Sequence, residues 1–186
     1  MERQKDDRQW LEAVRGGSDE ACRELVQRYG GMVFTVIARM VPQREDAEEL
    51  YQDVWVKAFG NIRSYDSQRS SLATWLEHIA YTSAVSHLRK RHHYVCYLDE
   101  QLEKLDVGEA EDEMMQSEED AIIDRLLEAV HLLPVEEQSL ISMFYYDELS
   151  LKEIAFVTDS LPSTVASRLC RIRNKLYKLI NKEGKR

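Results

Sequence analysis

Two clusters of basic side chains are the main chemical feature of this 186-residue sequence. The first is the run Arg89-Lys90-Arg91-His92-His93, and the second is the spaced set Arg168, Arg171 and Arg173. Guanidinium and ammonium groups bind phosphates, so each cluster could hold a nucleic-acid backbone. Each could instead be a set of cations that stabilises the C-terminus of a helix, which is worth about 0.3 to 1 kcal/mol. Both interpretations place these residues on helices.

The average charge of the chain hides these clusters. The net charge is -9 and the isoelectric point is about 5.1, which ordinarily argues against phosphate binding. The acid is concentrated in the centre, since residues 99–124 contain 12 acidic side chains against Lys104 alone, whereas residues 162–186 contain 8 basic ones against Glu183 alone. The acidic strip has weak periodicity, as solvated linkers do. We therefore expect two domains, 1–97 and 119–186, joined by an acidic linker over 98–118.

Catalytic, metal and membrane chemistry find little support in the sequence. Cys22, Cys96 and Cys170 are odd in number and far apart, which fits neither a disulfide framework nor a zinc site. Glu128 and His131 have the Glu-x-x-His spacing of di-iron proteins, but no second copy is present. No apolar run approaches the roughly 18 residues of a membrane span. We expect no enzyme, catalytic residue, metal, cofactor or small-molecule substrate, and a cytoplasmic protein without membrane insertion.

The elements that carry the basic residues are expected to be helices in an all-α fold. Only 7 Gly and 3 Pro interrupt the chain, too few for a barrel or sandwich. Helical spacing of apolar residues predicts a first helix stopped at Gly16-Gly17, a second from Ser18 to Pro42 with a bend at Gly30-Gly31, a third through Ala47 to Phe59, and a fourth from Leu72 that ends in the basic cluster.

The second half of the chain predicts a helix-turn-helix. Helical spacing over residues 122–133 stops at Pro134, which suits the start of a helix to about Tyr146. Ser150 and Glu153 form a capping box at the start of a short helix, the chain breaks over 158–161, and Pro162 begins a long basic helix. This arrangement is typical of DNA binding, although helical hairpins of this kind also serve only for packing.

Two separate blocks of the sequence resemble one family. The stretch Ala47-Glu48-Glu49-Leu50-Tyr51-Gln52-Asp53-Val54-Trp55, followed by Trp75-Leu76, Ile79-Ala80 and Leu88-Arg89-Lys90, resembles region 2 of the extracytoplasmic-function (ECF) RNA polymerase sigma factors. Leu132-Leu133-Pro134 and residues 150–173 resemble their region 4. The two blocks come in the family's order with an acidic linker between them. The chain departs from the family at Gln138, where arginine is common, and at Ser163, where glycine is common.

The resemblance implies a role for each block. Docking on core RNA polymerase would involve Glu49, Leu50, Gln52 and Asp53. Recognition and melting of the −10 promoter element would involve Ser64, Tyr65, Arg69, Ser70, Tyr81, Thr82, Arg89, Lys90 and Arg91. Recognition of the −35 element would involve Ser163, Thr164, Ser167, Arg168, Arg171 and Arg173. Trp75 lies on the apolar stripe, which favours core packing over base stacking.

The partners implied by the resemblance are core RNA polymerase, promoter DNA and an anti-sigma factor. Such a factor recruits the polymerase to promoters and helps to melt the duplex, and it catalyses no reaction. A runner-up function is a stand-alone regulator that binds DNA through the C-terminal helix-turn-helix alone. A gel shift with duplex DNA, with and without core polymerase, would separate the two functions.

Overall fold

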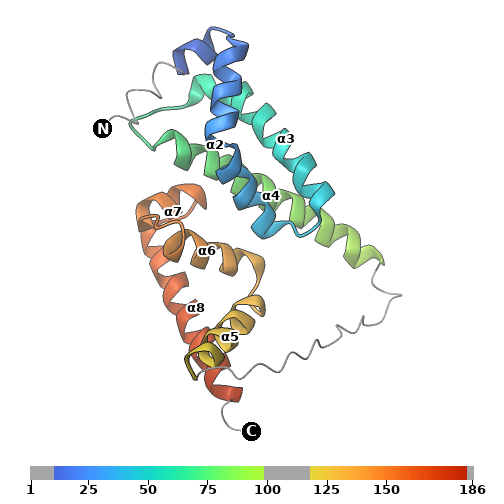
Figure 1. The fold of residues 1–186 in the computed structure, drawn as a ribbon, viewed down its shortest axis with the longest axis vertical. Helices are drawn as coiled ribbons and strands as arrows, with labels where there is room; N and C mark the ends of the chain where they lie inside the picture. The colour runs from blue at the N-terminus through green and yellow to red at the C-terminus, as the bar shows by residue number, and fades with distance from the viewer. Residues whose placement is uncertain (1–10, 99–117, 184–186) are drawn as a thin grey trace.

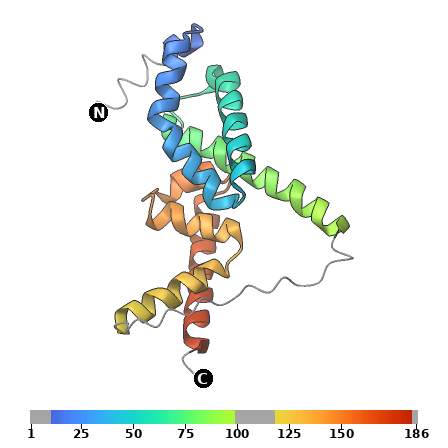
Figure 2. The same ribbon diagram turned by 45° about the vertical axis from the view of Figure 1, so that its right-hand side comes forward.

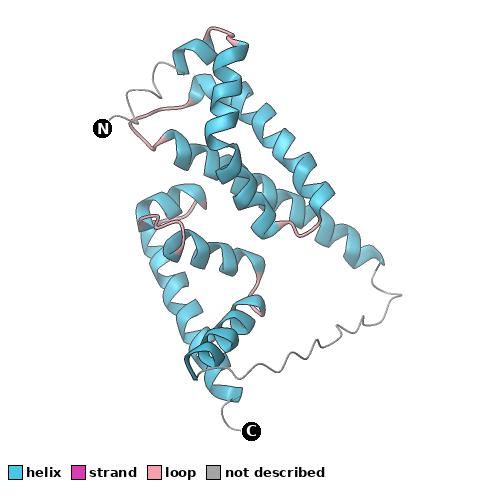
Figure 3. Ribbon diagram, in the orientation of Figure 1, coloured by secondary structure: helices cyan, strands magenta, loops and turns pink. Residues whose placement is uncertain are grey.

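The helices of the computed structural model fall into two groups, which follow the two halves of the chain (Figure 1). The structure describes residues 11–98 and 118–183; the side chains of residues 91–98, 118–122, 124 and 181–183 are outside the description. Within these ranges the fold is all-helical and has no strand, as predicted (Figure 3). The predicted linker lies almost entirely outside the described residues, so the domain boundaries stay predictions.

The N-terminal domain is built from helices α2 (Asp19–Met40), α3 (Arg44–Asn61) and α4 (Leu72–Leu98), with a short 3-10 helix η1 (Ile62–Ser64) after α3. Residues 11–15 are also helical, and Gly17 ends that turn with a φ of 85°. The Ser18 hydroxyl then caps α2 by accepting a hydrogen bond from the Ala21 N–H. These starts and stops confirm the predicted ones.

Helix α2 is continuous through Gly30 and Gly31, so the glycines at the predicted bend do not end the helix. Gly30 is buried, and a Cβ placed on it would lie 2.5 Å from the Tyr51 hydroxyl of α3. The Tyr51 ring is held between Phe34 and Trp55, whose centroids lie 5.8 and 6.3 Å away. Gly30 therefore permits a close approach of α3 to α2 and does not break the helix.

We expect Gly30→Ala to lower the free energy of unfolding by about 1 to 2 kcal/mol, because overpacking outweighs the gain of about 1 kcal/mol in helix propensity. In a Tyr51→Phe background the same change should become neutral or stabilising. Gly31→Ala is the matched control: its Cβ would meet no atom within 4 Å, so it should stabilise the protein. Urea unfolding measures all three, and equal effects at the two glycines would disprove the close-approach explanation.

Helix α4 also differs from its prediction, since it does not end in the basic cluster. The helix continues beyond Arg89 to Leu98, and its last turn contains no basic residue. Arg89 and Lys90 are exposed. These residues therefore do not act as cations at the C-terminus of the helix. Phosphate binding by the cluster stays a prediction.

The C-terminal domain consists of α5 (Glu118–His131), α6 (Val135–Tyr145), α7 (Leu151–Val157) and α8 (Pro162–Glu183). Both halves of the predicted capping box at Ser150 and Glu153 are present at the start of α7. Gln138 donates a hydrogen bond of 2.8 Å to the Leu133 carbonyl, so this departure from the family pattern serves the α5–α6 junction. The predicted helix-turn-helix is confirmed as α7, a turn and α8.

Buried apolar side chains connect both domains into one cluster. Val33, Ile37 and Met40 of α2 are fully buried in it. The contacts between domains are made by α2 with α6 and by α4 with α7 (Figures 1 and 2). The two domains therefore lie directly against one another in this structure.

Candidate nucleic-acid interface

The front of α8 presents a polar face. Its apolar stripe, Val165, Leu169, Ile172 and Leu176, is buried against the domain. Among the residues predicted for this face, Ser163, Ser167, Arg168, Arg171 and Arg173 are exposed and Thr164 is half-buried. All six predicted residues therefore lie on one helix whose opposite side is anchored in the core.

Two hydrogen bonds order the side chains along this face. Ser167 donates to the Ser163 carbonyl at 2.8 Å, and the Arg171 Nε donates to the Ser167 carbonyl at 3.3 Å. Arg168 is exposed on the same face. Ser167 and Arg171 are thus partly oriented by their own helix.

The loop before α4 contains two exposed predicted residues, Ser64 and Arg69, and a half-buried one, Ser70. Tyr65 is different, because it is buried, donates a hydrogen bond of 3.0 Å to the Ser70 carbonyl and packs its ring 5.4 Å from the Trp75 ring. Trp75 is also buried, as its place on the apolar stripe predicted. In this arrangement Tyr65 and Trp75 support the loop and offer little surface to a ligand.

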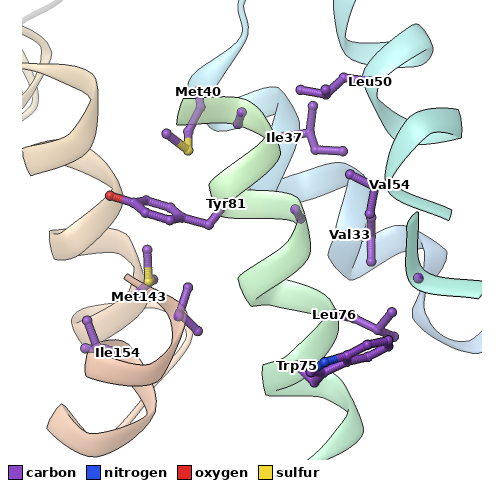
Figure 4. Packing of buried hydrophobic residues seen from close by; sticks show 14 of the residues in the cluster. Val33, Ile37, Met40, Leu50, Val54, Trp75, Leu76, Tyr81, Met143 and Ile154 are labelled. Carbon is purple, nitrogen blue, oxygen red and sulfur yellow. The ribbon is translucent and has the colours of Figure 1, made fainter. Parts of the chain in front are cut away.

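The predicted residues of α4 follow the loop along one side of the helix. Thr82 donates a hydrogen bond of 2.7 Å to the His78 carbonyl, while Arg89 and Lys90 are exposed. The Arg91 side chain lies outside the described residues. Tyr81 is only 7% exposed, because its ring extends from α4 toward α6 (Figure 4). The C-terminal domain therefore covers part of this predicted surface.

A groove of about 860 Å³ separates the two predicted DNA surfaces. Tyr81, Thr82 and Arg89 line one side of it, and Arg168 and Arg171 line the other. Burial raises the pKa of the Tyr81 hydroxyl, with Glu136 adding to the rise and Arg168 and Arg89 opposing it. The structure thus brings the residues predicted for the two promoter elements face to face.

A second groove of about 630 Å³ extends this meeting of the two domains. Ser64, Arg69 and Ser70 of the loop line it together with Phe156 of α7 and Pro162 of α8. The predicted −10 loop therefore also faces the helix-turn-helix.

The predicted polymerase-binding residues form a separate surface on α3. Glu49, Gln52 and Asp53 are exposed, whereas Leu50 is buried and packs in the core. Val56 was not predicted, but it is 72% exposed and lies one turn beyond Gln52 and Asp53. The sequence signal that could have identified Val56 is its spacing, because it follows Gln52 by four residues and Asp53 by three and so lies on the same polar face of the helix.

Among the described residues no group of three or more His, Cys, Asp or Glu side chains could hold a metal ion. In the same part of the chain no helix has both the length and the apolar character needed to cross a membrane.

Comparisons with known proteins match both halves of the chain. The family model for Sigma-70 region 2 matches residues 25–94, and that for Sigma-70, region 4 matches residues 123–176. The ECF RNA polymerase sigma-E factor of Haemophilus influenzae is 31% identical, over 95% of this chain and 96% of its own. The ECF RNA polymerase sigma factor SigW of Bacillus subtilis is 28% identical, over 90% and 93%.

One solved structure has a similar fold. It is the sigma factor RpoE of Bartonella quintana in complex with the anti-sigma factor NepR, with a TM-score of 0.61, 21% identity, and coverage of 86% of this chain and 96% of that one. The match spans both helical domains. The fold described above is therefore one that a sigma factor adopts.

Proposed function

The chain belongs to the ECF sigma factors of the sigma-70 family, and we propose that three surfaces described above carry out its separate tasks. As a member of this family it is a transcription initiation factor that binds core RNA polymerase and directs it to promoter DNA. The match to region 2 favours this function over a stand-alone helix-turn-helix regulator. The remaining question is which residues perform each task.

We assign polymerase docking to the exposed face of α3. Glu49, Gln52 and Asp53 supply two carboxylates and an amide on a rigid helix, and such groups set orientation and association rate with a basic partner. Val56 adds an exposed apolar group next to them. Leu50 contributes by anchoring the helix in the core, because it is buried.

We assign the −10 element to the loop before α4 and to the polar side of α4. Melting requires unstacking, which costs a few kcal/mol per extruded base, and a binding surface can offset it by about 1 to 3 kcal/mol per base. Ser64, Arg69, Tyr81 and Thr82 offer hydroxyl, guanidinium and aromatic groups for captured bases. Arg89 and Lys90, both exposed, are suited to backbone phosphates.

We assign the −35 element to the front of α8. The observation that carries this assignment is the exposed, ordered polar face opposite a fully buried stripe on the second helix of a helix-turn-helix. Ser163, Thr164, Ser167 and Arg168 lie at its N-terminal end, which enters the major groove in this motif. Arg171 and Arg173 follow as phosphate contacts.

The test is a comparison of two alanine variants on a library of promoter sequences. We expect Arg168→Ala to reduce run-off transcription by about 5- to 160-fold on promoters with a guanine at the contacted position, because a bidentate contact to guanine is worth about 1 to 3 kcal/mol. Arg171→Ala should weaken all promoters more uniformly and lower the salt dependence of binding. Identical promoter profiles for the two variants would refute this division of roles.

We further propose an anti-sigma factor as a partner, since the structurally similar RpoE of Bartonella quintana was solved with one. A cytoplasmic location and the absence of catalysis follow from the same function. Co-purification from the native host, followed by mass spectrometry, would identify such a partner.

A further inference from the structure

The contact between the two domains is specific rather than a loose approach. Arg39 at the end of α2 makes an ion pair with Asp147, in the loop after α6, with 2.6 Å between Nη1 and Oδ2. His78 Nδ1 lies 3.1 Å from the Val157 carbonyl at the end of α7, and its ring packs 5.4 Å from that of Phe156. Both contacts join α2 or α4 to the helix-turn-helix domain.

This contact is incompatible with simultaneous binding to both promoter elements. The −35 and −10 elements are about 25 base pairs apart by their names, which is roughly 85 Å of duplex at about 3.4 Å per base pair. In this structure the surfaces proposed for them line one groove, and Tyr81 is buried in the contact. The domains must separate before both surfaces can reach DNA.

Glu77 lies near charged groups of both domains at this contact. Its side chain is on α4, it is only 8% exposed, and its Oε2 is buried without a hydrogen-bond partner among the described residues. The charged groups that face it are Arg39 of α2, Asp147 of the loop after α6 and Glu153 of α7. Burial raises the pKa of the Glu77 carboxyl to about 7; Asp147 and Glu153 add to the rise, and Arg39 opposes it.

We propose that the contact of α2 and α4 with α6 and α7 is a closed state of this protein, and that ionisation of Glu77 opens it. A carboxylate at this position would lie in a nearly dry contact beside Asp147 and Glu153. Opening returns the charge to water and uncovers Tyr81. That the covered surface binds the −10 element rests on the proposed function. The contact between the domains and its control by Glu77 do not depend on that function.

The sign of the pH dependence follows from linkage. The pKa of Glu77 is about 7 when the domains are closed and returns toward its ordinary 4.5 when they separate. Protonation therefore favours closure, fully below about pH 4.5, and this contribution is lost as the pH rises through about 7. Between pH 6 and pH 8 the ratio of closed to open molecules should fall about tenfold.

The experiment measures the distance between the two domains in the full chain without DNA or polymerase. The native cysteines are replaced by Cys22→Ser, Cys96→Ser and Cys170→Ser, and spin labels are attached at Asp66→Cys in the loop before α4 and Lys152→Cys on α7, both exposed positions that line the same groove. Double electron–electron resonance at pH 6, 7 and 8 should show a short-distance population that declines as the pH rises.

Two further variants isolate the cause. Glu77→Gln, which mimics the protonated acid, should keep the short distance at every pH. Arg39→Glu removes the ion pair and places another carboxylate in the contact, so it should lengthen the distance even at pH 6. The charge swap of Arg39→Glu with Asp147→Arg should restore the short-distance population.

Two results of these distance measurements would overturn the proposal. A distance distribution that is independent of pH in the parent protein would overturn the proposal. So would a pH response that persists in Glu77→Gln, because a different group would then carry it. Failure of the assigned DNA residues would appear in the promoter profiles and leave these distances unchanged, so the two proposals fail separately.

Discussion

Reversing two charges on α3, with Glu49→Lys and Asp53→Lys together, is expected to weaken binding to core RNA polymerase by about a hundredfold or more. Both side chains are exposed and lie one turn apart on the proposed docking face. Placing like charges against a basic partner costs several kcal/mol and also slows association. Fluorescence anisotropy of the labelled protein with core polymerase, measured at low and physiological salt, gives the affinity.

The control for this prediction is Glu20→Lys with Glu24→Lys on α2. It has the same change in net charge, the same spacing of four residues and the same exposure. It should change the affinity less than about threefold, since only long-range steering is affected. If both pairs weakened binding equally, the α3 face would not be the docking surface. Val56→Ser would then be expected to have no effect either.

Local chemistry made most of the helices predictable from the sequence. The Ser18 cap, the Ser150–Glu153 capping box and Pro162 each act within one turn of their own helix, and each begins a helix where expected. Buried stripes such as Val165 and Leu169 followed from periodicity alone. These signals depend on neighbours in the sequence, so a single chain contains them in full.

The failures came where a residue's role depends on a distant element. Gly30 was expected only as part of a bend, and its close approach to the Tyr51 hydroxyl was missed because Tyr51 lies on another helix. Leu50 and Tyr65 were grouped with functional neighbours although packing contacts bury them. Their roles in binding remain predictions, but the structure places both side chains in the core.

The meeting of the two domains could not be predicted from the sequence at all. The ion pair of Arg39 with Asp147 joins residues separated by 108 positions, and no local pattern marks either partner. No sequence pattern marks Glu77, because only its burial near Asp147 and Glu153 makes its charge unfavourable. Tertiary contacts of this kind determine how the domains meet, whereas the local patterns determine the elements.

The second large effect is expected from Ile154→Ala in α7. Ile154 is fully buried, and Figure 4 shows it beside Met143 of α6. Truncating a buried isoleucine costs about 2 to 5 kcal/mol, and a unit the size of residues 118–183 has a total stability of only about 3 to 10 kcal/mol. We expect the C-terminal helices to unfold at a temperature at least 10 °C lower, with loss of −35 recognition.

The same variant tests whether the N-terminal domain folds independently of the helix-turn-helix. If α2, α3 and α4 form their own core, calorimetry of Ile154→Ala should show a second transition close to that of the parent, and affinity for core polymerase through α3 should be retained. Leu161→Ala is the matched control, since Leu161 is 68% exposed in the turn before α8 and its truncation leaves no cavity. A single transition lowered for the whole chain would instead mean that the contact of α4 with α7 makes the two domains one cooperative unit.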